Sequence, residues 1–259
     1  MKVVKGRKFP FLKFSWTLRQ SSKLNCVYPL KFKQKMDGWI DYGKFKVFNA
    51  EQRSAEWLKE RAKLCATTTD FYAILAYMEG NGEKPDRTKV VEENDAMLLG
   101  NLAEPHIRKW FKEAYLSGDS SIQELGLAVP KFYPKIGAST DGVILTSGKA
   151  VGIIEIKTTK KMYTTLKLRS EVQETLNEGS DNNVNPEEYI SPWHYAQMQG
   201  CMAILGMGVC HYIVWEHTSN TMHVEKVPFD QNYWERRLYP ALYYYIENGF
   251  SRTPQAQQA

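Results

Sequence analysis

"GASTDGVILTSGKAVGIIEIKTT", residues 137–159, is the stretch that decides the fold. Apolar residues alternate with small or polar ones on both sides of "TSGKA", and a period of two is typical of β-strands. We therefore predict strands over 141–147 and 150–157, joined by a tight turn. Two more segments with strand patterns precede them, at 122–129 and 135–139.

Three charged side chains of this hairpin can converge. Strand alternation places Glu155 and Lys157 on one face and the neighbouring isoleucines on the other. Asp141 lies fourteen positions before Glu155, across the turn. Two carboxylates and a backbone carbonyl form a hard oxygen site suited to Mg²⁺ or Mn²⁺, and a lysine there would orient water and offset charge developing on a phosphate. An ion pair on the exposed face of a strand would give the same pattern.

Length and composition indicate one globular domain. A chain of 259 residues, 43% of them hydrophobic, can bury one sizeable core. No apolar run approaches the roughly 20 residues of a membrane span, and the first 30 residues lack the apolar run of a signal sequence. The four cysteines form no CxxC pair, so neither a zinc ribbon nor a disulfide framework is indicated. We expect a soluble, intracellular protein without membrane contact.

Positive charge is concentrated at the start of the chain. Residues 1–46 hold twelve Lys or Arg and two acids, whereas the net charge of the whole chain is +5. A basic segment interleaved with aromatic residues suits a polyanion such as nucleic acid, although a solvated arm or a localisation signal would look the same. We divide the chain into a basic N-terminal arm (1–46), a single domain (47–250) and a polar C-terminal tail (251–259).

The remaining periodicity is mostly helical. Pro105 falls inside one helical pattern, where it predicts a kink or a fresh helix start at Glu104–Pro105. Ser191 and Pro192 are typical of the first residues of a helix. The expected order is helices near 50–64, 69–80 and 91–115, the antiparallel strands, a polar loop over 170–191, a helix from 191, a hairpin over 209–229 and a closing aromatic helix from 230. This order favours an α/β fold with a mixed β-sheet flanked by helices.

Five segments carry a resemblance to a known family. In chain order they are "QRSAEWLKER" with "CATTTD", "GNLAEPHI", "GASTDGVI", "GIIEIKTT" and "YAQMQGCMAI". Together they resemble the lambda-exonuclease or YqaJ-type viral recombinase (alkaline exonuclease) family, a branch of the PD-(D/E)xK nuclease superfamily. The resemblance covers about residues 52–215 and implies a restriction-endonuclease-like core. If the chain is viral, its compartment would be the cytoplasm or nucleus of the host.

The resemblance also implies roles for catalytic residues. Asp141 and Glu155 resemble the metal carboxylates of the family, with the backbone carbonyl of Ile156 as a further ligand. Lys157 resembles its catalytic lysine. Gln199 is similar to the residue that positions water or substrate, and Gln197 is its neighbour on the same helix. Glu104 resembles the helical acid that completes the active-site shell.

A second group of residues resembles the part of the family site that holds the DNA end. Arg61 and Thr68 correspond to an arginine and a small hydroxyl residue that bind the terminal 5′-phosphate, a pairing that suits a guanidinium. "CATTTD" departs from the usual pattern, so Thr67 and Thr69 are also candidates. Trp57 matches an aromatic residue near the DNA end. Thr140 stands where the superfamily name has proline.

The resemblance implies a Mg²⁺-dependent exonuclease, with Mn²⁺ as a possible substitute. Such an enzyme digests linear double-stranded DNA ends from 5′ to 3′, releases 5′-phosphorylated nucleotides and leaves single strands for annealing recombination. Its expected partners are double-stranded DNA ends, a single-strand annealing protein and, as a homo-trimer, copies of itself. A structure-directed endonuclease of the same fold, or a catalytically silent scaffold that binds DNA ends, remains an alternative.

Overall fold

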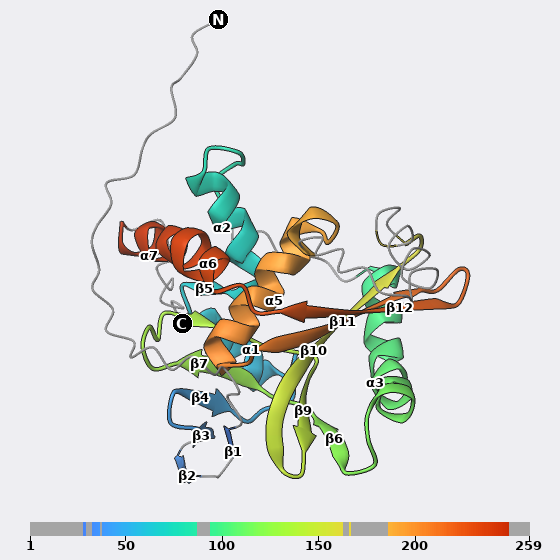
Figure 1. The fold of residues 1–259 in the computed structure, drawn as a ribbon. Coiled ribbons are helices and arrows are strands. Elements are labelled where there is room, and N and C mark those ends of the chain that lie inside the picture. Colours follow the sequence, from blue (N-terminus) through green and yellow to red (C-terminus); the bar gives the residue numbers. More distant parts are fainter. Residues whose placement is uncertain are drawn as a thin grey trace, which may run out of the picture.

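The computed structural model describes residues 28–29, 33–36, 38–86, 94–162, 166 and 186–248. Most of the predicted basic arm, most of the polar loop over 170–191 and the tail over 251–259 lie outside these residues. A mixed sheet occupies the centre, with helices on both of its sides (Figure 1). The predicted α/β class is confirmed.

The strands are short except at the centre of the sheet. In chain order they are β1 (Tyr28–Pro29), β2 (Lys33–Met36), β3 (Trp39–Asp41), β4 (Phe45–Phe48), β5 (Ala66–Thr67), β6 (Ser120–Gln123), β7 (Leu127–Pro130), β8 (Ile136–Gly137), β9 (Gly142–Thr146), β10 (Lys149–Thr159), β11 (Val209–Glu216) and β12 (Thr221–Pro228). The helices are α1 (Ala55–Ala62), α2 (Phe71–Met78), α3 (Asp95–Tyr115), α5 (Pro192–Leu205), α6 (Gln231–Tyr233) and α7 (Tyr239–Glu247). Short turns add η1 (Thr68–Asp70), η2 (Pro186–Glu188) and the π-helical η3 (Trp234–Leu238).

The main sheet has the strand order β12-β11-β10-β9-β6, with β1 paired to the start of β10. Strands β10 and β11 run parallel, and their neighbours run antiparallel. A second sheet joins β2, β3, β4 and β7, and β5 pairs with β8. Because β4 spans position 46 and pairs with β7, the end of the predicted arm is part of a sheet.

The predicted strand over 122–129 is wrong. It splits into β6 and β7, which belong to different sheets. The break falls at Gly126, where a Cβ would lie 2.0 Å from the carbonyl oxygen of Phe48. Only glycine allows this approach, so the chain leaves one sheet here and enters the other.

A two-residue turn and a bulge set the register of the central hairpin. Ser147 and Gly148 both have positive φ, 49° and 73°, as a tight hairpin turn requires. Lys149 pairs with Thr146, but the register shifts between Ala150 and Gly152, which leaves one extra residue in β10. Beyond this bulge the pairing continues to Gly142, the first residue of β9.

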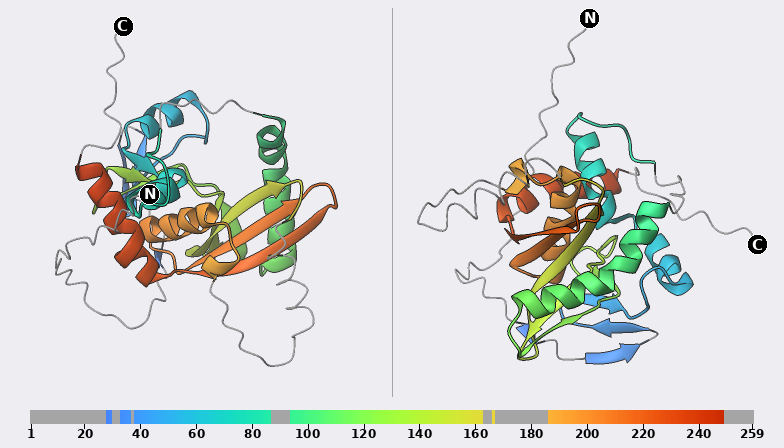
Figure 2. Two further views of the ribbon diagram at one scale, coloured as in Figure 1. Left: turned by 90° about the horizontal axis from the view of Figure 1, so that it is seen from above. Right: turned by 90° about the vertical axis from the view of Figure 1, so that its right-hand side faces the viewer.

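The two faces of β10 have different neighbours, as the alternation predicted. Ile154 and Ile156 are buried in a cluster with residues of α3, namely Ala103, Ile107 and Phe111. Glu155 and Lys157 lie on the other face and contact α5 through Gln197. Figure 2 shows α3 and α5 on opposite sides of these strands. Glu155 and Lys157 therefore lie between the central strand and α5, whereas the candidate Glu104 belongs to α3.

Helix boundaries agree with the sequence in most places. Helix α5 begins with Ser191 as N-cap and Pro192 in its first turn, and it ends at Gly206, whose φ is 68°. The closing helix is interrupted by the π-turn η3, just before Pro240. Helix α3 runs without a break through Pro105, so the alternative of a fresh helix start at that residue is wrong.

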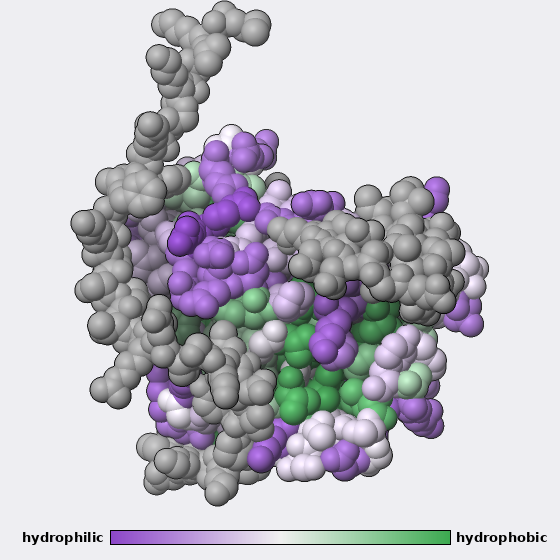
Figure 3. All heavy atoms as spheres, viewed as in Figure 1, coloured by the Kyte–Doolittle hydropathy of each residue, from purple (hydrophilic) through white to green (hydrophobic). Residues whose placement is uncertain are grey.

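The surface is chemically mixed. Figure 3 shows polar atoms over the helices at the top and an apolar area lower on the front, where Figure 1 draws the strands of the main sheet. Among the described residues, no helix is both long and apolar enough to cross a membrane.

Candidate active site

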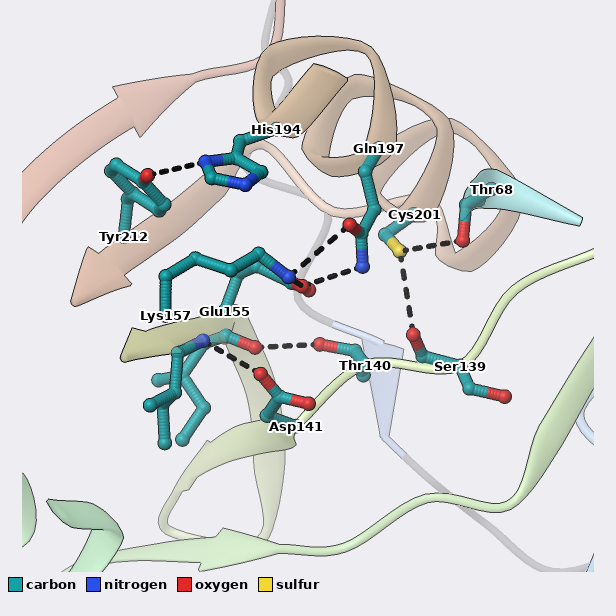
Figure 4. A network of polar contacts seen from close by, with 12 residues as sticks. Thr68, Ser139, Thr140, Asp141, Glu155, Lys157, His194, Gln197, Cys201 and Tyr212 are labelled. Atoms are coloured by element: carbon teal, nitrogen blue, oxygen red, sulfur yellow. Dashed lines mark hydrogen bonds and ion pairs between the residues drawn. The ribbon is translucent and has the colours of Figure 1, made fainter. Parts of the chain in front are cut away.

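The central hairpin brings the two predicted metal carboxylates together. Asp141 lies in the loop just before β9, and its Oδ2 accepts a hydrogen bond of 2.6 Å from the backbone N–H of Ile156. Extending the β9–β10 register by one residue places Asp141 opposite Glu155, with both side chains on the same face. Figure 4 shows the two acids and Lys157 close together.

Glu155 is almost fully buried, with 1% of its surface exposed. Its Oε1 accepts hydrogen bonds from Lys157 Nζ at 2.6 Å and Gln197 Nε2 at 2.5 Å. Its Oε2 is buried and has no hydrogen-bond partner in the described part of the chain. Burial is the main cause that raises the pKa of Glu155 to about 8. Lys157 opposes this rise and Asp141 adds to it. A buried carboxylate oxygen without a donor calls for a cation.

Two buried carboxylates beside a backbone carbonyl suit a divalent metal ion better than a buried site without a cation. Burial raises the pKa of Asp141, because the charged carboxylate has lost much of its water. Two carboxylates with a neighbouring backbone carbonyl suit Mg²⁺, which keeps several of its waters. Within the described residues, no three His, Cys, Asp or Glu side chains are placed to hold a metal together. A site here therefore relies on two carboxylates, backbone and water.

Lys157 keeps its charge beside these acids. Burial acts to lower the pKa of Lys157, but the carboxylates of Glu155 and Asp141 together raise it. About a quarter of its side chain (26%) is exposed. Lys157 Nζ also donates to Gln197 Oε1 at 3.3 Å. The amide of Gln197 thus touches both the acid and the base of the cluster.

The structure places Gln197, and not Gln199, in the candidate site. Gln199 is fully buried, its Nε2 donates to Pro228 O at 3.0 Å, and its Oε1 accepts from Asp230 N at 2.8 Å. Both of its polar atoms therefore hold α5 to the end of β12. Residues two apart on a helix point in different directions, so only one of the two glutamines can face β10.

The two glutamines should respond differently to substitution. Gln199→Ala leaves the backbone groups of Pro228 and Asp230 without partners, and we expect a loss of about 2–3 kcal/mol in the free energy of unfolding. Gln197→Ala should leave this free energy nearly unchanged and lower DNA hydrolysis about 10–100-fold. Urea unfolding of both variants, alongside hydrolysis rates, checks the assignment. Equal effects on stability would contradict it.

Helix α3 contributes a further acid. Arg108 Nη1 donates to Glu104 Oε1 at 2.6 Å and to the backbone carbonyl of Asp141 at 3.0 Å. Burial raises the pKa of Glu104 to about 6, with Asp141 adding to this rise and Arg108 opposing it. Arg108 thus ties α3 to the loop that carries Asp141. Arg108 was not predicted as a site residue, although its position four residues after Glu104 is typical of a helical ion pair.

His194 was also missed. Its Nδ1 lies 2.7 Å from Tyr212 OH, and Figure 4 shows the ring beside Lys157. Burial, aided by the charge of Lys157, lowers the pKa of His194 to about 3, so the ring is neutral. His194 lies one helical turn before Gln197 in "WHYAQ", and this spacing could have indicated that both side chains face the site.

The predicted phosphate-binding residues form a second cluster. Arg61 Nη2 donates to Thr67 Oγ1 at 2.8 Å and to Thr69 Oγ1 at 2.7 Å. Thr68 is buried and faces α5, where its hydroxyl accepts from Cys201 Sγ at 3.6 Å. The geometry therefore groups Arg61 with Thr67 and Thr69 and directs Thr68 away.

Trp57 lies beneath this cluster. The Arg61 guanidinium stands 5.1 Å from the centroid of its ring. Only 4% of Trp57 is exposed, and it packs with Leu64, Leu127 and Val129. The structure thus places Trp57 in the core, as a support for Arg61.

Comparison with known proteins identifies the family. The model of the YqaJ-like viral recombinase domain matches residues 56–208, which is more than half of the chain. The chain belongs to this family. No curated protein matches the sequence.

Solved structures show that this chain shares the fold of an alkaline exonuclease. LHK-Exo from Laribacter hongkongensis is 20% identical, with a TM-score of 0.51, over 75% of this chain and 92% of that one. The same enzyme in complex with dAMP gives 19% identity and a TM-score of 0.50 over the same shares. The predicted core, a mixed sheet flanked by helices, is confirmed, and it shares its fold with this alkaline exonuclease.

Thr140, the residue before Asp141, fixes the loop that leads into β9. Thr140 is fully buried, and its Oγ1 donates to the carbonyl of Ile154 at 2.7 Å. This bond fixes the loop against β10 one residue before Asp141. A hydroxyl group thus provides the restraint on the loop.

Proposed function

We propose that the protein is a metal-dependent DNA exonuclease that digests linear double-stranded DNA from its 5′ ends. Membership of a viral recombinase family and the fold of an alkaline exonuclease support a nuclease of DNA recombination. The observation that carries the proposal is Glu155 Oε2, a buried carboxylate oxygen without a donor, set beside Asp141 and Lys157. The products would be 5′-phosphorylated nucleotides and a single strand for annealing, with an annealing protein as partner.

The chain's own residues divide the work of phosphodiester hydrolysis. Asp141, Glu155 and the carbonyl of Ile156 would hold Mg²⁺, with Mn²⁺ as an alternative. The bound metal supplies a Lewis acid that polarises the scissile phosphate and lowers the pKa of water. Lys157 orients the attacking water and offsets charge on the pentacovalent phosphate. Gln197, rather than Gln199, positions this lysine through its contact with Nζ.

The second cluster suits the terminal phosphate of the strand being cut. Arg61 and the hydroxyl of Thr69 offer a cation and a further donor for one phosphate group, whereas the buried Thr67 hydroxyl donates to Asp70 Oδ2 at 2.9 Å and supports the Arg61 guanidinium. Cys201 lies between the chain neighbours of the two clusters: its Sγ contacts Thr68 Oγ1, next to Thr67 and Thr69 in the chain, and the carbonyl of Ser139, two residues before Asp141 (Figure 4). We infer that a strand with its 5′-phosphate at Arg61 runs past this contact toward the acids.

Loss of Arg61 should remove the preference for a 5′-phosphate. Charge-assisted hydrogen bonds contribute about 1.5–3 kcal/mol, so Arg61→Ala should lower the ratio of rates on phosphorylated and unphosphorylated ends about 10–100-fold. Lys59→Ala removes an exposed charge from the same helix and serves as the matched control. An unchanged ratio in Arg61→Ala would place the phosphate elsewhere.

Digestion of end-labelled linear duplex with Mg²⁺, with and without a 5′-phosphate, tests the proposal as a whole. An exonuclease releases label from the 5′ end and leaves closed circular DNA intact. Cleavage of the circle would show an endonuclease instead. Tight binding of ends without any metal-stimulated hydrolysis would show a silent scaffold.

A further inference from the structure

An exposed tryptophan stands at the start of α5, beside the candidate active site. Trp193 is 51% exposed, unlike most large aromatic side chains, which stabilise a fold by burial. Its ring meets the ring of Tyr72 on α2 edge to face, with the centroids 5.1 Å apart. This contact holds the indole at one position and leaves much of its surface open.

The position of Trp193 on α5 places it next to the candidate catalytic residues. Trp193, Gln197 and Cys201 follow one another at intervals of four residues, so they line one side of the helix. Gln197 contacts Glu155 and Lys157, and Trp193 lies one turn away, about 6 Å along the helix axis. Side chains of a helix lean toward its N-terminus, which brings the amide of Gln197 closer to the turn of Trp193.

The residues that contact α5 from the segment opposite it show the order of these positions along a bound strand. Thr68 and Tyr72 are also four residues apart, and they contact Cys201 and Trp193, respectively. The two segments therefore run antiparallel, with the Arg61 cluster near the Thr68 end. A DNA strand with its 5′-phosphate at that cluster would pass Gln197 and then reach Trp193.

We propose that Trp193 stacks on a nucleobase of the strand being cut, just beyond the scissile phosphate, with Tyr72 as its support. The inference rests on the proposed exonuclease function and extends it to a residue that positions the substrate. Stacking tolerates any sequence, because every base has a π face. Such a contact suits an enzyme that degrades strands of any sequence.

Abasic substrates separate stacking from a structural role. On 5′-phosphorylated duplex, we expect Trp193→Ala to lower kcat/KM about tenfold and Trp193→Phe to restore most of it. Abasic sites at the first nucleotides of the 5′ strand should lower kcat/KM of the wild type by a similar factor, with no further loss in Trp193→Ala. Tyr244→Ala, which removes an equally exposed aromatic ring from α7, should match the wild type.

Two outcomes would overturn the inference. One is wild-type kcat/KM in Trp193→Ala on intact DNA, and the other is an equal loss in this variant on intact and abasic DNA. If the wild type hydrolyses no DNA, the exonuclease proposal fails separately. Trp193 is then tested by binding in Ca²⁺: single-stranded DNA should quench the fluorescence of the wild type more than that of Trp193→Phe, and an abasic strand should not.

Discussion

Replacing Lys157 with alanine should lower the rate of DNA hydrolysis about a thousandfold. Removal of one preorganised group that stabilises transition-state charge costs 10²–10³ in rate, and Lys157 is in addition the cation nearest to both acids. Binding of duplex ends should persist, because Arg61 and its hydroxyl partners are unchanged. Single-turnover digestion measures the rate, and fluorescence anisotropy with Ca²⁺ measures the binding.

Lys149→Ala is the matched control for this variant. Lys149 is exposed at the start of the same strand, far from the acids in the register. The Lys149→Ala variant should digest DNA at the wild-type rate. Activity in Lys157→Ala within a few-fold of this control would remove Lys157 from the mechanism.

Glu155→Gln should abolish the stabilisation of the folded protein by metal. A ligand present at 100 times its dissociation constant stabilises the native state by about 2.7 kcal/mol, which is a rise of about 5–10 °C in Tm for a chain of this size. The amide keeps the volume of the side chain but loses the charge that a divalent cation needs. Thermal unfolding with and without Mn²⁺ therefore reports on the site without any assay of activity.

Glu225→Gln provides the comparison. Glu225 is another buried carboxylate of the main sheet, on β12, where Oε1 accepts a hydrogen bond from Tyr189 OH and Oε2 lies 3.5 Å from His223 Nε2 rather than beside a second acid. Whatever the Tm of this variant without metal, Mn²⁺ should raise that Tm by as much as it raises the Tm of the wild type. An equal rise in Glu155→Gln would mean that the metal binds elsewhere.

The central hairpin shows how much of the fold could be predicted from sequence. Its strands and the opposite faces of Glu155 and Ile156 follow from a period of two, and the structure confirms both. The split between β6 and β7 could not be predicted, because it depends on the approach of Gly126 to Phe48, far away in the chain. Local patterns specify the elements, whereas contacts between distant segments decide where a strand ends.

The candidate site, too, was predictable from the sequence only in part. Asp141, Glu155 and Lys157 could be predicted because one hairpin carries them all. The choice between Gln197 and Gln199 depends on which one meets β10, and the chain beyond β12 settles this by binding Gln199. The roles assigned to all these side chains stay predictions until the variants are measured.

The bulge in β10 has a consequence for the recognition of distant relatives. Five paired positions on each strand, the two turn residues and the one bulged residue make up the interval between Asp141 and Glu155. A hairpin that is one pair longer would widen this interval by two residues, and loss of the bulge would narrow it by one. Both changes would leave the acids facing each other at the open end. A search pattern with a fixed gap between them would therefore overlook relatives whose active centres have the same geometry.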